Sequence, residues 1–94
     1  MIKSFKCKET EKIFKGLISR KFPIDIHSRA FNKLAAVQAS LTLDDLKSPP
    51  ANHLKQLKGD LAAQYSVRIN KKYRICFEWH DNNAYNVEMA DYHD

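Results

Sequence analysis

The sequence is poor in cysteine and has no recognisable metal or phosphate-loop motif. Its two cysteines, Cys7 and Cys76, lie far apart and form no C-x-x-C pair. This spacing argues against a disulfide framework or a cysteine-based zinc site, so we expect two small thiols that pack as hydrophobes. The four histidines are not at ligand spacing, and no glycine-rich loop is present, so we expect neither a metal nor a cofactor.

The sequence also lacks the long apolar runs that membrane insertion and secretion require. No run approaches the ~18 residues of a membrane-spanning helix. The segment Met1–Lys8 alternates charged and apolar residues, so it has no continuous apolar core of the kind found in secretory signals. We therefore expect a cytoplasmic protein with no membrane partner.

The residues that are present are typical of one small basic domain. The 94 residues, 44% of them hydrophobic, suffice for one compact core, so residues 1–94 are expected to form a single domain. Lys and Arg total 16 against 11 Asp and Glu, and no basic residue follows Arg74. A basic body with an acidic end favours a polyanion such as RNA as partner, although a solvated charged surface is the alternative.

Apolar periodicity predicts two helices in the first half of the chain. The first is expected within residues 8–20 and the second from about Asp25 to Ser40. Residues 42–45 are a cap signal for one further helical turn, and the Pro-Pro pair requires a loop over residues 47–52. The helix residues expected to be buried are Ile13, Phe14, Leu17 and Ile18, then Ile26, Ala30, Leu34, Val37 and Leu41.

Alternation of apolar and polar residues predicts the strands. Residues 2–7 are expected to form a short N-terminal strand. The last third is expected to form an antiparallel meander over residues 65–69, 73–79 and 85–89, with turns at 70–72 and 81–83. The predicted fold class is therefore α+β: a small antiparallel-rich sheet, made of the N-terminal strand and the C-terminal three-stranded meander, with two helices packed on one face.

The same alternation sets the register, because the apolar residues must share one face of the sheet. Arg68 then falls opposite Arg74 on the polar face. Tyr92 continues on that face, flanked by Asp91 and His93. The other pairs expected are Ile69 with Tyr73, Val67 with Ile75, Phe77 with Val87, Ile75 with Met89 and Arg74 with Ala90.

Two directly opposed arginines repel each other, so their pairing requires a compensating partner. One solution is an anion between them, because the guanidinium fork matches a phosphate group. The other solution is neutralisation by Glu78, Glu88 or Asp91 within an ordinary polar face.

The residues near the two arginines are the parts of a ribonuclease that uses no metal. Such cleavage deprotonates a ribose 2′-OH, stabilises a pentacovalent phosphate and protonates the leaving 5′ oxygen. His93 can act as base or acid near neutral pH, while arginines stabilise the phosphorane charge. Tyr92 can stack on a base or donate its hydroxyl. On the preceding loop, His53, Lys55 and Lys58 either close the same cleft or are simply solvated.

Several short segments, in their order and spacing, resemble HigB-type toxins of the RelE/ParE superfamily. The shared segments are M-I-K-S-F at 1–5, K-S-P-P-A-N-H-L at 47–54, L-K-G-D at 57–60, Y-R-I-C-F at 73–77 and D-Y-H at 91–93. The S-P-P loop and the N-V-E…D-Y-H ending are most similar to the GraT branch of that family. No single motif is specific, whereas their arrangement over essentially the whole chain is.

The resemblance implies an activity, a target and a partner. HigB-type toxins cleave mRNA in the A site of the 30S ribosomal subunit without a metal, through the 2′-OH, and so inhibit translation and growth. Their partner is a helix-turn-helix antitoxin of the HigA type, through which alone operator DNA is bound. By position, Asp91, Tyr92 and His93 match the family's C-terminal catalytic group, Arg74 matches its phosphate-stabilising arginine and Lys58 its loop lysine.

One position departs from the family pattern. In one form of the family, the segment that corresponds to residues 54–59 reads L-H-P-L-K-G, with a functional histidine at its second position. This chain reads L-K-Q-L-K-G there, so Lys55 takes the place of that histidine. A solvated lysine, with a pKa of about 10.4, is a poor base at neutral pH but a good phosphate clamp. Either Lys55 stabilises charge while His93 transfers protons, or His53 takes the missing role. The expected catalytic residues are Asp91, Tyr92, His93, Arg74 and Lys55, and the expected RNA-binding residues are Arg68, Lys58, His53, Lys71 and Lys72.

Two other functions are compatible with this sequence. A superfamily relative can poison another target, such as DNA gyrase, by binding alone, although a pure binder needs no acid–base group. A small basic RNA- or ribosome-binding module would expose aromatic side chains on its sheet. The aromatic residues Tyr65, Tyr73, Phe77 and Trp79 are instead expected on the core face.

Overall fold

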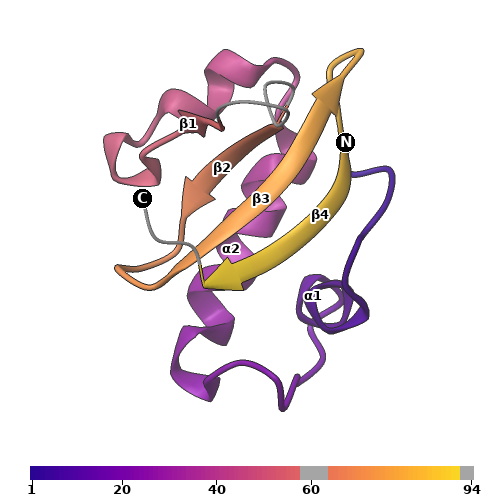
Figure 1. Cartoon of the computed structure of the whole chain (residues 1–94), viewed down its shortest axis with the longest axis vertical. Helices are drawn as coiled ribbons and strands as arrows, with labels where there is room; N and C mark the ends of the chain where they lie inside the picture. Colours follow the sequence, from indigo (N-terminus) through magenta and orange to yellow (C-terminus); the bar gives the residue numbers. More distant parts are fainter. Residues whose placement is uncertain (58–63, 92–94) are drawn as a thin grey trace.

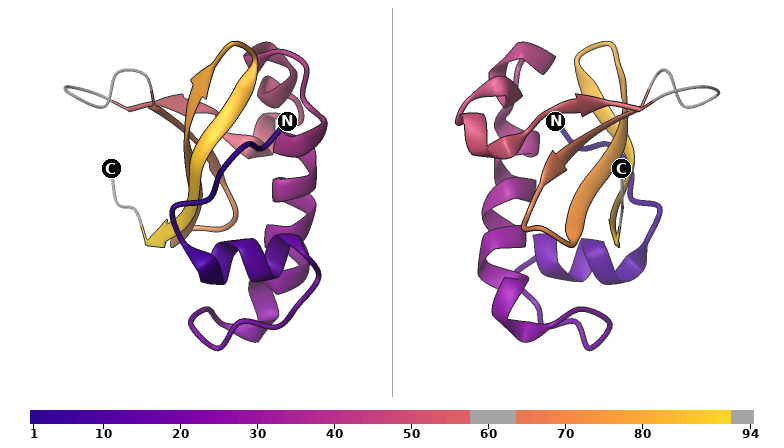
Figure 2. Two further views of the ribbon diagram at one scale, coloured as in Figure 1. Left: turned by 90° about the vertical axis from the view of Figure 1, so that its right-hand side faces the viewer. Right: turned by 60° about the vertical axis from the view of Figure 1, so that its left-hand side comes forward.

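The computed structural model describes residues 1–57 and 64–91, and within these ranges the chain forms one four-stranded antiparallel sheet with two α-helices. Helix α2 runs along one face of the sheet, and α1 packs against α2 and β4 (Figures 1 and 2). No helix of the described ranges is long and apolar enough to cross a membrane. The elements are α1 (Lys8–Phe14), the 3-10 turn η1 (Ile24–Ile26), α2 (His27–Ala39), the 3-10 turns η2 (Leu43–Lys47) and η3 (Pro50–Asn52), and the strands β1 (Lys55–Gln56), β2 (Gln64–Arg68), β3 (Tyr73–His80) and β4 (Asn83–Asp91).

The core lies between α2 and the sheet, as the apolar pattern predicts. Ala30, Leu34 and Val37 recur at helical spacing on α2 and are completely buried. They form one cluster with Ile13, Ile26, Val67, Ile75, Phe77, Val87 and Met89. Leu41, predicted to be buried, is 78% exposed, because α2 has ended and the extended backbone at Ser40 carries the chain away from the core.

Helix α1 is shorter than the predicted span. It ends at Phe14, and Gly16 and Leu17 donate backbone hydrogen bonds of 3.0 and 2.8 Å back into its last turn. Gly16 has a φ of +80°, the left-handed conformation that closes a Schellman motif and that glycine adopts without strain. Leu17 and Ile18 therefore leave the helix and are 56% and 70% exposed, so the prediction that they are buried is wrong, whereas Ile13 is buried.

The N-terminal residues do not form the predicted strand. Instead, Ile2 and Phe5 make two isolated parallel bridges to Ala84 and Val87 on β4. Between those bridges Asn86 has a φ of +52°, which interrupts the pleat and prevents a continuous ladder along this edge. The fourth strand is β1, at the opposite edge of the sheet beside β2.

The predicted meander is confirmed over most of its length. The observed pairs include Arg68 with Arg74, Val67 with Ile75, Arg74 with Ala90 and Ile75 with Met89. The turn at 70–72 also closes as predicted, since the backbone N–H of Ile69 donates to the Tyr73 carbonyl at 3.0 Å. The two arginines are therefore cross-strand neighbours.

The far end of the second hairpin differs from the prediction. A register shift between Cys76 and Glu78 replaces the expected pairing of Phe77 with Val87, and the extra residue belongs to β4. The turn contains two residues instead of three, since His80 pairs with Asn83. Asp81 and Asn82, with φ of 50° and 61°, adopt the two positive values that a type I′ turn requires.

Candidate functional site

The centre of the polar sheet face is Arg74, which is 8% exposed. Its Nε donates to Ser66 Oγ at 2.8 Å, and its Nη2 donates to the His53 carbonyl at 2.5 Å. A buried charge normally requires an opposite charge or several hydrogen bonds, and these partners are neutral oxygens. Within the described residues no carboxylate forms an ion pair with Arg74. The guanidinium is thus held in place by neutral partners, and no carboxylate of residues 1–57 and 64–91 compensates its charge.

Arg68 avoids its cross-strand neighbour by leaning the other way along β2. Its Nε donates to the Asn70 carbonyl at 3.1 Å, toward the β2–β3 turn. Arg74 reaches in the opposite direction, to Ser66. This divergence lowers the repulsion between two paired arginines without cancelling either charge.

The three acidic residues considered as neutralising partners are engaged elsewhere. Glu88 lies 3.3 Å from Lys6 Nζ, and Glu78 lies 3.6 Å from the His80 ring. Asp91 lies 3.9 Å from Lys72 Nζ. Among the described residues, the hypothesis that these carboxylates neutralise the arginine pair is therefore wrong.

His53 is brought to the arginines by a loop that Asn52 anchors. Asn52 is 1% exposed, and its Nδ2 donates to the carbonyls of Leu46 and Ser48 at 3.1 and 3.2 Å. Its Oδ1 accepts a hydrogen bond from Lys33 on α2. His53 follows with φ 45° and ψ 52°, which turns its carbonyl toward Arg74. Sequence reasoning missed Asn52, because an isolated asparagine after two prolines reads as an ordinary loop residue.

Lys55 and Asp91 lie on opposite faces of the sheet. Lys55 pairs with Ser66, the residue that accepts from Arg74, and cross-strand partners share a face. Asp91 pairs with Tyr73, whose side chain points to the other face from that of Arg74. The structure brings Lys55 to the arginine face and leaves Asp91 off it. The predicted site residues Lys58, Tyr92 and His93 lie outside the described residues.

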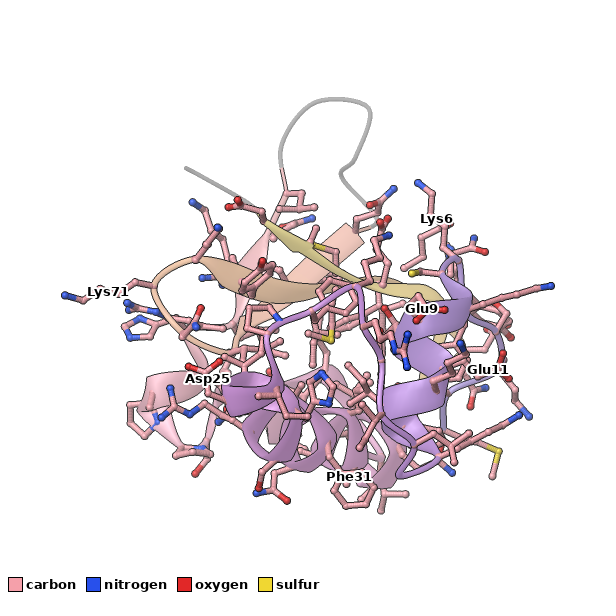
Figure 3. The ribbon with its side chains drawn as sticks, turned by 90° about the horizontal axis from the view of Figure 1, so that it is seen from below. Lys6, Glu9, Glu11, Asp25, Phe31 and Lys71 are labelled. Atoms are coloured by element: carbon pink, nitrogen blue, oxygen red, sulfur yellow. The ribbon has the colours of Figure 1, made fainter. Side chains whose placement is uncertain are left out.

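The β2–β3 turn presents two lysines in different ways. The Asn70 side chain accepts from the backbone N–H groups of Lys72 and Tyr73 at 2.8 and 2.7 Å, which fixes the turn. Lys72 then lies 5.5 Å from the centre of the Tyr73 ring and pairs with Asp91. Lys71 projects from the molecule on the side opposite Glu9 and Glu11 of α1 (Figure 3).

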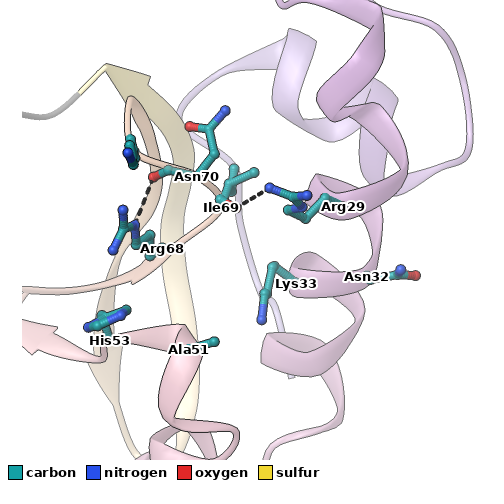
Figure 4. A pocket seen from close by; sticks show the side chains of 9 residues that line it. Arg29, Asn32, Lys33, Ala51, His53, Arg68, Ile69 and Asn70 are labelled. Atoms are coloured by element: carbon teal, nitrogen blue, oxygen red, sulfur yellow. Dashed lines mark hydrogen bonds between the residues drawn. The ribbon is translucent and has the colours of Figure 1, made fainter.

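A cleft of about 550 Å³ opens beside Arg68, between α2, residues 51–53 and the β2–β3 turn. Figure 4 shows His53 and Arg68 near each other on one wall, with Arg29 and Lys33 projecting from α2 on the other. Sequence reasoning gave Arg29 and Lys33 no role; their i, i+4 spacing on the polar side of α2 was the available signal. The lining residues are Arg29, Asn32, Lys33, Ala51, His53, Arg68, Ile69, Asn70 and Lys71.

The two cysteine thiols have pKa values shifted in opposite directions, and Cys76, on the arginine face, lacks the character of a nucleophile. Burial, with a further contribution from Glu88, raises the pKa of the Cys76 thiol to about 11, so it stays protonated at neutral pH. At Cys7, burial opposes ionisation, but hydrogen bonds from Thr10 outweigh it and lower the pKa. Both thiols are free, as predicted for packed cysteines. In the described part of the chain, no three His, Cys, Asp or Glu side chains are placed to hold a metal ion.

Comparison with known proteins extends the resemblance over the whole chain. Residues 3–93 match a family described as the RelE-like toxin of the type II toxin–antitoxin system HigB. Toxin HigB-1 of Vibrio cholerae serotype O1 is 37% identical over 70 residues, which cover 74% of this chain and 74% of that protein. Endoribonuclease HigB of Proteus vulgaris is 29% identical over 93 residues, which cover 99% of this chain and 100% of that protein.

The fold is also found in a solved toxin–antitoxin complex. The chain superposes on one in the YoeB–YefM complex from Staphylococcus aureus with a TM-score of 0.60 at 18% identity, over 100% of this chain and 99% of that chain. At this identity the likeness concerns the fold alone. The family is shown instead by the match over residues 3–93 and by the relative at 37% identity. This chain belongs to the HigB-like family of RelE-like toxins of type II toxin–antitoxin systems.

Proposed function

We propose that this chain is an endoribonuclease toxin that cleaves mRNA in the A site of the 30S ribosomal subunit and thereby inhibits translation and growth. The observation that carries the proposal is the arginine pair. Buried Arg74 donates to neutral oxygens, Arg68 lies directly across from it, and no carboxylate in the described part of the chain forms an ion pair with either. Lys55 and His53 border the same site. A ribosomal target implies that the protein acts in the cytoplasm.

The proposed reaction needs a place for a phosphate and two proton transfers. The ribose 2′-OH loses its proton to a base as its oxygen bonds to the adjacent phosphorus. The bond from phosphorus to the 5′ oxygen then breaks, and that oxygen takes a proton from an acid, leaving a 2′,3′-cyclic phosphate. Arg74 stabilises the extra negative charge on the pentacovalent phosphorus, because its direction is fixed before the substrate arrives. Lys55, a cation on the same face, serves as a second phosphate clamp.

The proton transfers are assigned to the C-terminal residues Tyr92 and His93 and to Asp91. His93 is the residue of this group whose ordinary pKa lies near neutral pH, so it acts as base or acid. His53 is the alternative source of the base or the acid, because its backbone already contacts Arg74. Arg68, Lys58, Lys71 and Lys72 complete the proposed RNA-binding set.

The proposed partner is a HigA-type helix-turn-helix antitoxin that neutralises the toxin. Membership of a toxin–antitoxin family supports an antitoxin partner in general. Operator DNA is then bound through the antitoxin and not by this chain. The GraT-like character of the S-P-P loop remains a prediction of the same kind.

The test is induced expression of the chain in bacterial cells, followed by mapping of new 5′ ends in mRNA. We expect cuts within translated frames from the natural sequence and their loss in Arg74→Ala, with a fall of about 10²–10³-fold in cleavage rate from the loss of one charge-stabilising group. Arg20→Ala is the matched control, since Arg20 is an exposed arginine on the loop after α1. It is expected to cleave normally.

The alternative functions give different results in this experiment. Growth arrest with intact mRNA would replace cleavage by the poisoning of another target, such as DNA gyrase. Cleavage that persists in a soluble, folded Arg74→Ala protein would remove Arg74 from the mechanism. Binding through exposed sheet aromatics is disfavoured, because Tyr65, Tyr73 and Trp79 pack against the core.

A further inference from the structure

The cleft described above is lined by cationic groups from three separate parts of the chain. Arg29 and Lys33 come from α2, His53 from the loop after η3, and Arg68 and Lys71 from the end of β2 and its turn. Among the described residues that line the cleft, none is an aspartate or glutamate. Within residues 1–57 and 64–91, none of the four Arg and Lys side chains forms an ion pair.

The contacts of these groups fix their positions without neutralising them. Arg29 Nη1 donates to the Ile69 carbonyl at 3.4 Å, so it spans from α2 to the end of β2. Lys33 donates to the Asn52 side chain, which links α2 to the loop of His53. Arg68 donates to the Asn70 carbonyl. All three acceptors are neutral oxygens, so the described residues give the lining of the cleft a strongly positive charge.

The four positive charges around this cleft repel one another, and a bound anion relieves that repulsion. The cleft is also connected to Arg74. His53 contributes its carbonyl to Arg74 and its side chain to the cleft, while Arg68 is the cross-strand partner of Arg74 and lines the same cleft. An RNA backbone bound at Arg74 therefore has a continuous basic path past His53 and Arg68 to α2.

We propose that the cleft between α2 and the β2–β3 turn is a second phosphate-binding site, in which Arg29 and Lys33 hold an RNA backbone phosphate next to the cleavage site. The inference rests on the proposed function in that the ligand is RNA. Two sources share this chemistry: the mRNA strand that is cleaved, and ribosomal RNA at the A site. Because the contacts are to phosphate, the site contributes affinity and position and not base preference.

The test measures RNA binding separately from cleavage. A short single-stranded RNA in which every 2′-OH is methylated cannot undergo 2′-OH attack, so affinity is measured without turnover. The double variant Arg29→Gln/Lys33→Gln is compared with Lys3→Gln/Lys8→Gln, which removes the same charge from two exposed residues near the N-terminus. For a phosphate contact, we expect about fivefold weaker binding near ~0.1 M salt in the first variant, and a salt slope that is shallower by about 0.7.

A second variant separates charge from structure, because Arg29 and Lys33 also connect elements of the fold. Ala51 is exposed and lines the cleft, so Ala51→Glu adds a carboxylate there while both cations and their hydrogen bonds remain. Asn82→Asp makes the same change in net charge at the β3–β4 turn, at the opposite end of β3. We expect Ala51→Glu to weaken RNA binding and Asn82→Asp to leave it unchanged.

The same variants are measured on vacant 30S subunits to distinguish the two sources. Weaker binding to the single-stranded RNA assigns the site to mRNA. Weaker binding to 30S subunits, with the oligonucleotide unaffected, assigns it to ribosomal RNA. If folded variants of both kinds bind both probes like the natural sequence, the proposal is wrong. If these variants bind RNA normally and Arg74→Ala loses cleavage, the second phosphate site is wrong but the proposed function stands. If the natural chain cleaves no mRNA, the proposed function is wrong.

Discussion

Asn52→Ala is the substitution that best tests how the sequence builds the site. Asn52 is a buried polar residue at the end of η3, and its side chain links η3 to η2 and α2. Its amide donates to the carbonyls of Leu46 and Ser48 and accepts from Lys33. Alanine removes all three interactions and leaves the Leu46 carbonyl in a buried place without its donor.

The expected cost follows from these contacts. Loss of the hydrogen bond to the part-buried Ser48 carbonyl costs about 1 kcal/mol net, and the Leu46 carbonyl, which is left buried and unpaired, costs about 1–3 kcal/mol. The Lys33 ammonium is half-buried and regains water, so its lost bond adds little. We expect the free energy of unfolding to fall by about 2–4 kcal/mol, which for a domain of this size lowers the Tm by roughly 8 °C or more.

The assay is urea unfolding followed by circular dichroism, with cleavage measured under conditions in which the variant is folded. Asn32→Ala is the matched control, because Asn32 is exposed on α2, and its free energy of unfolding is expected to change by less than about 0.5 kcal/mol. Asn52→Asp keeps an acceptor for Lys33 and loses both donors, so it is expected to be at least as destabilising. A loss below about 1 kcal/mol in both Asn52 variants would refute the role of the two donors.

Three further results are expected. His93→Gln should lower the cleavage rate by about 10²–10⁴-fold, and an undiminished rate would move acid–base catalysis to another residue of the site. Gly16→Ala should destabilise the fold by about 1 kcal/mol in thermal melts, through backbone strain alone, since no atom lies within 4 Å of the added Cβ. Burial raises the pKa of Cys76 from its usual 9.0 to about 11, so the stability that this protonated thiol contributes is present below pH 9 and is lost as the pH rises toward 11. Cys76→Ala lacks this titration, so the difference in unfolding free energy between the natural chain and the variant should shift in favour of the variant between pH 9 and pH 11. A difference that does not change with pH would contradict the raised pKa of Cys76.

The spacing of apolar residues along the sequence predicted those parts of the fold that follow the regular repeat of a strand or a helix. The register of the first hairpin follows from the two-residue period of a strand, so Arg68 opposite Arg74 was predictable once the apolar residues were placed on one face. The buried stripe of α2 follows in the same way from the helical period. Even the early end of α1 was encoded locally, because Gly16 marks it, although the apolar residues Leu17 and Ile18 suggested a longer helix.

Tertiary contacts decided the features that the spacing of apolar residues does not predict. Residues 2–7 alternate like a strand, yet a positive φ at Asn86 limits their pairing with β4 to two bridges. Arg29 and Lys33 face a cleft, because α2 packs beside the loop that Asn52 holds, and that packing joins segments far apart in the sequence. The opposite lean of Arg68 and Arg74 likewise depends on acceptors that the folded chain supplies at Asn70, Ser66 and His53. The sequence alone therefore determined which faces and residue types the site uses, whereas the directions of its charges depend on long-range hydrogen bonds that exist only after folding.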